Sequence, residues 1–220
     1  MCTTSRIIMA GLVGFALFVM PVMVSAGDAE ALSRQALQQC EQGRLATVRD
    51  ARMGHFQQGQ SLAEQAVATN EGSADAHFAL FCNLGEQLRL DGESLTSVFG
   101  FRRMMNELDR ALEIDPAHID ALSAKGTLLV KLPGLLGGDS EKGEQLLQHV
   151  IKRAPKAVNA RLALAKVRCE HGNYQEAVAL ASDALAIAGK DGRTTFVQEA
   201  KAVLRQAQTQ AAKTVYAVNR

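Results

Sequence analysis

The sequence predicts an all-α protein built from stacked pairs of short helices. The stretch from Asn159 to Ala184 divides into two amphipathic segments around Gly172, and alanines recur at i, i+4 and i+7 in the second segment. This spacing gives that helix a narrow face that can lie close against a neighbour. The same pattern, a turn glycine followed by regularly spaced small residues, occurs again elsewhere in the chain. Aromatic residues make up only 5% of the sequence, and few segments alternate apolar and polar residues, so we expect essentially all helix.

The turn of this unit has its own signature. Gly172 supplies a left-handed residue that ends the first helix, and Tyr174 is large enough to fill the wedge between the two helices. Residues 54–59 repeat the order of residues 172–177, which places a matching turn at Gly54. The ladders of small residues that follow are Gly59, Ala63 and Ala66 in one copy and Ala177, Ala181 and Ala184 in the other.

Two middle copies align through the ends of their second helices, Ala111–Pro116 and Val150–Pro155. A small residue in the first helix, Gly-x-Tyr at the turn and a small-residue ladder in the second helix together resemble the tetratricopeptide repeat. The resemblance implies a right-handed α-solenoid of about four helix pairs, because a single pair cannot bury its own apolar face. The expected organisation is repeats over residues 27–192, divided at about 27–73, 74–118, 119–157 and 158–192, followed by a capping helix and tail over 193–220.

The N-terminus indicates export. Residues 1–26 hold one basic residue, Arg6, followed by an apolar run from Ile7 to Val24 and small residues that end at Ala26. This pattern is typical of a secretory signal peptide cleaved after about Ala26. The alternative is an uncleaved membrane anchor, since about 18 apolar residues can just span a bilayer. We favour cleavage, a periplasmic location and no stable membrane insertion afterwards.

Charge excludes some partners. Without Arg6 the chain has 23 basic and 23 acidic residues, and it has no run of lysine or arginine. A neutral chain of this kind is a poor ligand for nucleic acid. We therefore expect a protein or a small molecule as the partner, and no nucleic acid.

The first repeat is expected to contain two helices, and the second an insertion. A long helix should run from Ala29 to about Arg52, followed by a helix over Phe56 to Thr69. The second repeat carries an insertion at residues 91–103, where Asp91-Gly92 breaks a helix and Ser94 could cap the next. Four phenylalanines fall nearby: Phe78, Phe81, Phe99 and Phe101. They could line an apolar ligand pocket or a protein-binding groove, or they could supply extra core to a longer helix. We favour the extra core.

The third repeat carries a second insertion, at residues 132–139. Pro133 ends its first helix, and Asp139 or Ser140 caps its second. The pattern Pro-x-Leu-Leu-Gly-Gly-Asp-x-x-Lys-Gly, followed by Leu146, Leu147, Ile151 and Pro155, resembles the T component of TRAP-type transporters. That resemblance covers roughly residues 119–185 and implies an exported protein that accompanies a periplasmic solute-binding partner. The last helix should run from about Thr194 to Val215 and cap the array, with a frayed tail after it.

Three cysteines remain after removal of the signal segment: Cys40, Cys82 and Cys169. Either Cys40 and Cys82 form a disulfide between the first two repeats, or all three are thiols buried as small apolar residues. We favour the buried thiols, because spacing alone does not bring two side chains within bonding distance.

We expect no catalytic site, metal or cofactor. The glycines at 134, 137 and 138 lack the Gly-Lys-Ser/Thr and the preceding strand of a phosphate loop. The five histidines are not spaced as metal ligands, and no nucleophile motif is present. The chain is therefore not interpreted as an enzyme.

Two surfaces are candidates for binding. Solenoids of the resembled family present the first helices of their repeats on a concave face, for which alignment selects Asp75, Phe78, Glu86, Asp120, Ser123, Thr127, Asn159, Leu162 and Lys166. This set has one lysine, so we expect a mixed polar and apolar groove rather than a clamp for a C-terminal carboxylate. The two insertions could form one apolar rim, which we predict to contact the partner or ligand: Val98, Phe99, Phe101, Leu135 and Leu136.

Two functions follow. The first is an exported scaffold for interactions between proteins of the cell envelope. The second is an accessory of a TRAP-type transporter that binds a small apolar or amphipathic ligand beside Phe78, Phe99 and Leu135.

Overall fold

A computed structural model describes residues 26–92 and 97–218 of the chain. All regular secondary structure in these two ranges is helical. The α-helices are α1 (Ala26–Leu45), α2 (Arg49–Thr69), α3 (Ala74–Asp91), α4 (Ser97–Ile114), α5 (Ile119–Lys131), α6 (Ser140–Arg153), α7 (Val158–Glu170), α8 (Tyr174–Lys190) and α9 (Thr194–Val218). A short 3-10 helix, η1 (Gly134–Leu136), joins α5 to α6. None of the described helices combines the length and apolar character that a bilayer span requires.

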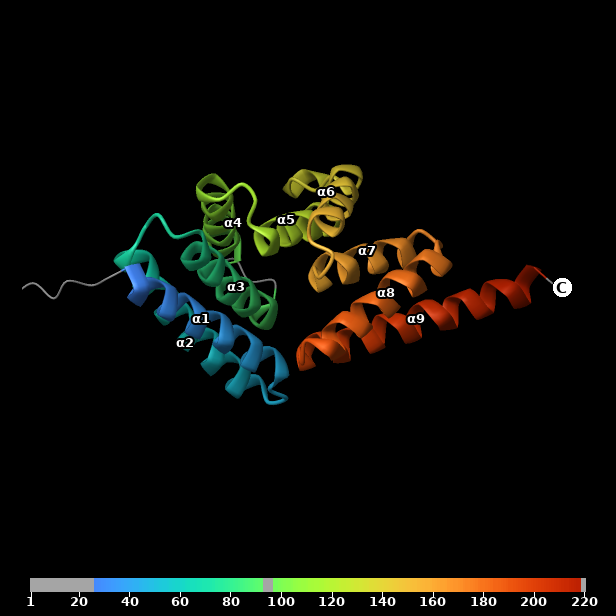
Figure 1. Cartoon of the computed structure of the whole chain (residues 1–220), viewed down its shortest axis with the longest axis horizontal. Helices are drawn as coiled ribbons and strands as arrows, with labels where there is room; N and C mark the ends of the chain where they lie inside the picture. Colours follow the sequence, from blue (N-terminus) through green and yellow to red (C-terminus); the bar gives the residue numbers. More distant parts are fainter. Residues whose placement is uncertain (1–25, 93–96, 219–220) are drawn as a thin grey trace, which may run out of the picture.

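The helices form consecutive antiparallel pairs that stack along an arc (Figure 1). α1 pairs with α2, α3 with α4, α5 with α6 and α7 with α8, and α9 lies against both helices of the last pair. The arc is curved enough that α1 contacts α9. The first helices of neighbouring pairs also pack on each other, although α3 and α5 lie less closely together than α1 and α3, α5 and α7, or α7 and α9.

Side chains cap the starts of α3 and α6, and the cap of α6 at Asp139 is one of the two that the sequence predicts. The hydroxyl of Ser73 accepts a hydrogen bond from the amide of Ala76 at the start of α3, and the carboxylate of Asp139 accepts one from the amide of Lys142 at the start of α6. Such side chains satisfy amides that have no partner within the helix. Gly172 has a φ of 79°, which confirms the left-handed turn predicted between α7 and α8.

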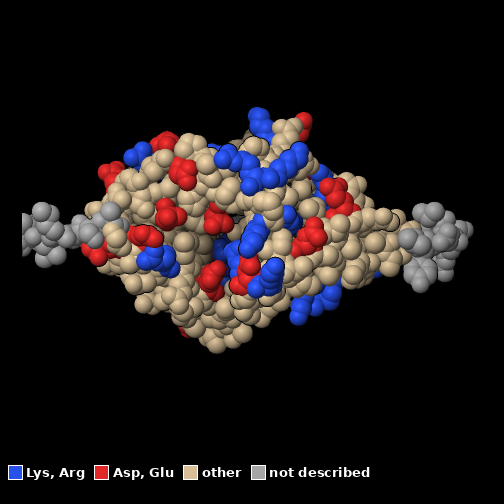
Figure 2. All heavy atoms as spheres, in the orientation of Figure 1, with Lys and Arg blue, Asp and Glu red and all other residues tan. Residues whose placement is uncertain are grey.

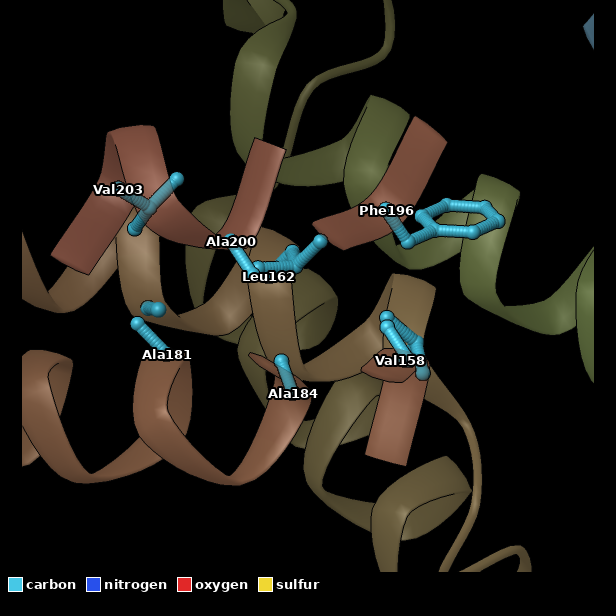
Figure 3. Packing of buried hydrophobic residues seen from close by; sticks show 9 residues of the cluster. Val158, Leu162, Ala181, Ala184, Phe196, Ala200 and Val203 are labelled. Atoms are coloured by element: carbon cyan, nitrogen blue, oxygen red, sulfur yellow. The ribbon is translucent and has the colours of Figure 1, made fainter. Parts of the chain in front are cut away.

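The core of the last repeat is a layer of small residues between three helices (Figure 3). Ala181 and Ala184 of α8 meet Val158 and Leu162 of α7, and Ala200 of α9 covers them. All three alanines are fully buried. The alanine ladder therefore works as predicted, because methyl groups let three helices approach closely.

The first helix pair differs from the prediction. The sequence suggests one helix from Ala29 to about Arg52, with the turn at Gly54. In the structure α1 ends at Leu45, α2 begins at Arg49, and Gly54 lies inside α2. The expected match between Gly54 and the turn residue Gly172 is therefore wrong, although the ladder after it is buried as expected.

Packing between α1 and α2 explains the earlier turn. Phe56 of α2 is fully buried and lies over Gly43 of α1, where a Cβ atom would stand 2.3 Å from the ring. The chain must reverse before Arg49 to bring this ring onto α1. The N–H of Ala46 still bonds to the carbonyl of Gln42, so α1 closes its last turn at the reversal.

Cys40 and Cys82 form a disulfide that joins α1 to α3, and Cys169 is a free, buried cysteine. The preference for three thiols is therefore wrong. Stacking of the first two pairs places the two Cα atoms 6.5 Å apart, within the range that a disulfide spans. Sequence spacing alone does not carry that information.

The two insertions have different structures. Gly92, with a φ of 73°, ends α3, and the proposed cap Ser94 lies outside the described residues. Gly100 lies inside α4, against Leu88 of α3. The second insertion contains η1 and returns to the array through a hydrogen bond from the amide of Asp139 to the carbonyl of Leu129. The last helix reaches Val218, three residues beyond the predicted end.

Candidate functional site

The concave side of the arc carries a groove of about 790 Å³. Figure 2 shows this hollow near the centre of one face, with acidic and basic side chains around it. Its walls come from α1, α2, α3, α4, α5, α7 and α9, so both ends of the array contribute. The contact between α1 and α9 brings the two ends together beside it.

Apolar side chains line the middle of the groove. Phe78 and Phe81 of α3 stack with their ring centres 5.8 Å apart. Leu128 of α5 packs in the same cluster, and Phe101 and Met104 of α4 also face the groove. Phe78 additionally lies against the ring of His118, at 5.1 Å. The floor of the groove is thus aromatic and aliphatic where α3, α4 and α5 meet.

A buried carboxylate holds the wall formed by α1 and α3. Glu86 is 3% exposed, and its Oε1 accepts hydrogen bonds from Arg44 Nε at 2.7 Å and from Arg89 Nη1 at 2.9 Å. Arg44 also contacts the sulfur of Cys82 at 3.4 Å. Oε2 of Glu86 has no hydrogen-bond partner among the described residues. One carboxylate therefore binds two arginines that line the groove, and one of them, Arg44, also contacts the disulfide.

The opposite wall comes from α7 and α9. Lys166 donates to Glu199 at 2.5 Å, and the guanidinium of Arg193 lies 4.2 Å from the centre of the Phe196 ring. This wall belongs to the capping helix as much as to the repeats.

Lys131, the last residue of α5, also lines the groove. Lys131 is exposed, but nearby protein atoms partly desolvate its ammonium group, and this desolvation together with the like charges of Lys166 and Arg89 lowers the pKa of Lys131. No described residue forms an ion pair or a hydrogen bond with its side chain.

Most residues predicted for the concave face do line the groove: Phe78, Glu86, Asp120, Ser123, Thr127, Asn159 and Lys166. Two predicted positions do not. Leu162 is 1% exposed and belongs to the core between α7 and α9, because α9 covers the face that an uncapped repeat would leave open. Asp75 lies at the start of α3, where it pairs with His118 at 3.1 Å.

The predicted rim divides between two environments. Phe101 packs into the core under the groove, whereas Val98, Phe99, Leu135 and Leu136 are exposed, Phe99 by 79% and Leu135 by 100%. None of the hydrophobic clusters among the described residues joins Val98 or Phe99 to Leu135 or Leu136. The structure therefore shows two exposed apolar sites, one on each insertion, and removes Phe101 from the rim.

Sequence reasoning misses two parts of the groove. Arg44 of α1 is not predicted, because the sequence pattern places the turn of the first pair at Gly54. With the turn at that position, the residues of α1 that face the groove cannot be identified. Arg193, Phe196 and Glu199 are not predicted because α9 is interpreted only as a cap. The paired charges Lys166 and Glu199, 33 positions apart, have no local signal in the sequence.

Comparisons with known proteins agree with this architecture. Residues 135–193 match the tetratricopeptide repeat family model. A thermophilic tetratricopeptide repeat protein of Thermus thermophilus superposes with a TM-score of 0.51 at 19% identity, over 80% of this chain and 99% of that one. A MamA double mutant from RS-1 gives a TM-score of 0.44 at 15% identity, over 86% and 99% of the two chains. No curated protein matches in sequence.

At 19% identity the likeness to the Thermus thermophilus structure establishes the fold alone. The helix pairs, the buried ladders and the match over residues 135–193 point the same way. This chain therefore has the fold of an all-α tetratricopeptide-repeat solenoid, closed at its C-terminal end by the additional helix α9.

Proposed function

We propose that this protein is an exported, non-enzymatic scaffold that binds a segment of another cell-envelope protein in its concave groove. The observation that carries the proposal is the groove itself, whose walls come from both ends of a tetratricopeptide-repeat solenoid. It combines an apolar floor with fixed charges on both walls, a composition that suits a protein segment with mixed side chains.

Photo-crosslinking in the source cell tests where the partner binds. A benzoylphenylalanine at Thr127, which lines the groove, should give a discrete adduct with one partner. The same group at Lys152, an exposed residue of α6 outside the groove, is the matched control. Equal adducts at both positions, or none at position 127, would contradict binding in the groove.

Export is the second element of the proposal. The basic and apolar pattern of residues 1–26 supports it, and so does the Cys40–Cys82 disulfide, because disulfides persist in oxidising compartments. Fractionation of the source cell followed by N-terminal sequencing should find the protein in the periplasm, beginning at about Gly27. Recovery with the membranes and an intact N-terminus would instead support the anchor.

The exposed residues of the insertions provide a further contact in this proposal. Val98, Phe99, Leu135 and Leu136 would bind the same partner outside the groove. The double variant Phe99→Ala/Leu135→Ala removes the two most exposed of these side chains and no buried ones. It should keep the melting temperature and lower the crosslinking yield at position 127; an unchanged yield would exclude these residues.

The size of the groove favours a second candidate function. A volume of about 790 Å³ over an apolar floor lies within the range of small-molecule pockets, about 300–1,000 Å³. The protein would then be an accessory of a TRAP-type transporter, with a periplasmic solute-binding protein as its partner and a small apolar or amphipathic ligand in the groove. Native mass spectrometry of the purified protein should show a bound small molecule that denaturation releases.

A further inference from the structure

The basic side chains of the groove differ in whether a neighbouring group balances or contacts their positive charge. Six of them line it: Arg44, Arg52, Arg89, Lys131, Lys166 and Arg193. Arg44 and Arg89 bind Glu86, Lys166 binds Glu199, Arg52 donates to the carbonyl of Gly43, and Arg193 lies over the ring of Phe196. Among the described residues, Lys131 is the member of this set without such a partner.

The surroundings of Lys131 are electrostatically unfavourable for a lone cation. Lys166 of α7 and Arg89 of α3 act on it with like charge, and Glu199 of α9 and Glu170 of α7 oppose them more weakly. Among the described residues, Lys166 binds Glu199 and Arg89 shares Glu86 with Arg44, whereas Lys131 has no carboxylate partner. One added negative charge beside Lys131 would relieve this repulsion. Lys131, Lys166 and Arg89 together with Glu199 and Glu170 carry a net charge of about +1, so a single negative charge is enough to neutralise this part of the groove.

The apolar floor begins on the same face of α5 as Lys131. Ala124, Thr127 and Leu128 all line the groove, and Leu128 precedes Lys131 by one helical turn. Leu128 packs with Phe78 and Phe81 of α3. A cation therefore stands at one end of an apolar floor, in a groove beside which α1 and α9 meet.

From this charge complementarity we propose that the groove binds a small amphiphile with one negative charge, of which a medium-chain carboxylic acid is the simplest kind. Its carboxylate pairs with Lys131, and its apolar chain lies on Phe78, Phe81 and Leu128. The inference rests on the second candidate function, ligand binding in the groove, and adds the chemical class of the ligand and the residue that selects its charge.

Calorimetric titration of the full chain with three ten-carbon probes tests the proposal. The probes are decanoate, decanol and decylammonium, which share the apolar chain and differ in the charge of the head group. Decanoate should bind about tenfold or more tightly than decanol, as a charge-assisted contact predicts, and decylammonium should bind more weakly than decanol. Equal binding of the three probes would overturn the selection of an anion.

Three variants separate the parts of the inference. Lys131→Met should reduce the affinity for decanoate about tenfold and leave that for decanol unchanged. Lys201→Met, at an exposed lysine of α9 outside the groove, should change neither. Thr127→Trp fills the groove and should abolish binding of all the probes.

The outcomes distinguish the two levels of the claim. If Thr127→Trp abolishes binding while Lys131→Met has no effect, the groove is a ligand site but Lys131 does not select the charge. If no probe binds to the folded chain, or if Thr127→Trp binds them as the parent does, ligand binding in the groove fails and this inference fails with it.

Discussion

The two ends of the solenoid are stabilised in different ways. In α7, α8 and α9 the helices meet through alanines, and the buried contacts are almost all apolar. In α1, α2 and α3 the helices bury Ser33, His77, Asn83 and Glu86 and are joined by a disulfide. The family match, residues 135–193, covers α7 and α8 and stops well short of α1 to α3.

Each polar side chain buried at the N-terminal end makes at least one hydrogen bond, although Oδ1 of Asn83 and Oε2 of Glu86 have no partner among the described residues. Asn83 of α3 donates to the carbonyl of Ala36 on α1 at 3.0 Å, and His77 lies between Glu107 and the carbonyl of Glu71. Such groups cost free energy to bury unless they are hydrogen-bonded. A repeat can therefore depart from the alanine pattern when hydrogen bonds and a covalent link hold its helices in register.

The largest expected effect comes from the covalent link. The double variant Cys40→Ala/Cys82→Ala should lower the free energy of unfolding by about 3 kcal/mol, because the disulfide restricts the unfolded chain over a separation of 42 residues. Urea unfolding monitored by circular dichroism measures this. Dithiothreitol should destabilise the parent similarly, and the double variant not at all.

Cys169 provides the control for that experiment. It is buried in α7, and burial raises the pKa of its thiol, so it should stay reduced and unreactive in the folded protein. The Cys169→Ala variant should keep the full response to dithiothreitol. A parent protein that unfolds identically with and without reductant would contradict the proposed difference between the two ends.

At the C-terminal end the critical change is an increase in side-chain volume. Ala181→Leu should lower the free energy of unfolding by about 2 kcal/mol, because the added atoms have no room between α7, α8 and α9. Ser182→Leu, at the exposed neighbouring position of α8, is the matched control and should unfold like the parent. Equal effects of the two substitutions would show that the ladder does not face the core.

Gly59 occupies the ladder position of the N-terminal end that Ala177 holds at the other end. A Cβ atom there would lie 2.1 Å from Oδ1 of Asn83. Gly59→Ala should therefore cost about 1.5 kcal/mol in the free energy of unfolding. The cost should shrink in an Asn83→Ala background, where room is available; a cost independent of Asn83 would place the conflict elsewhere.

The smallest effect distinguishes the two glycines that the sequence treats as equivalent. Gly54 lies inside α2 with no neighbouring atom within 4 Å of an added Cβ, so Gly54→Ala should stabilise the protein by about 0.8 kcal/mol through helix propensity. Gly172 has a positive φ, so Gly172→Ala should destabilise it. Thermal unfolding of both variants shows whether each substitution raises or lowers the melting temperature. A lower melting temperature for Gly54→Ala would support the turn that the sequence predicts at Gly54.

Local sequence patterns determined the helix pairs, their number and the ladders of small residues, since periodicity and turn chemistry act over a few positions. They also placed Phe78, Ser123 and Thr127 on the groove, because a repeat transfers one face from copy to copy. The first pair was predicted wrongly, because the residues that follow Gly54 resemble those that follow the turn glycine Gly172. The packing of Phe56 on Gly43, which requires α1 to end earlier, is a tertiary contact.

The tertiary structure alone decided the contacts between distant segments. The Cys40–Cys82 bond requires α1 and α3 to stack with their Cα atoms 6.5 Å apart, and the wall from α9 depends on the curvature that carries α9 to α1. The ion pair between Lys166 and Glu199 likewise requires α9 to pack on α7. Local periodicity specifies each helix and its apolar face, whereas the curvature of the array sums small rotations at every interface and has no single residue that encodes it.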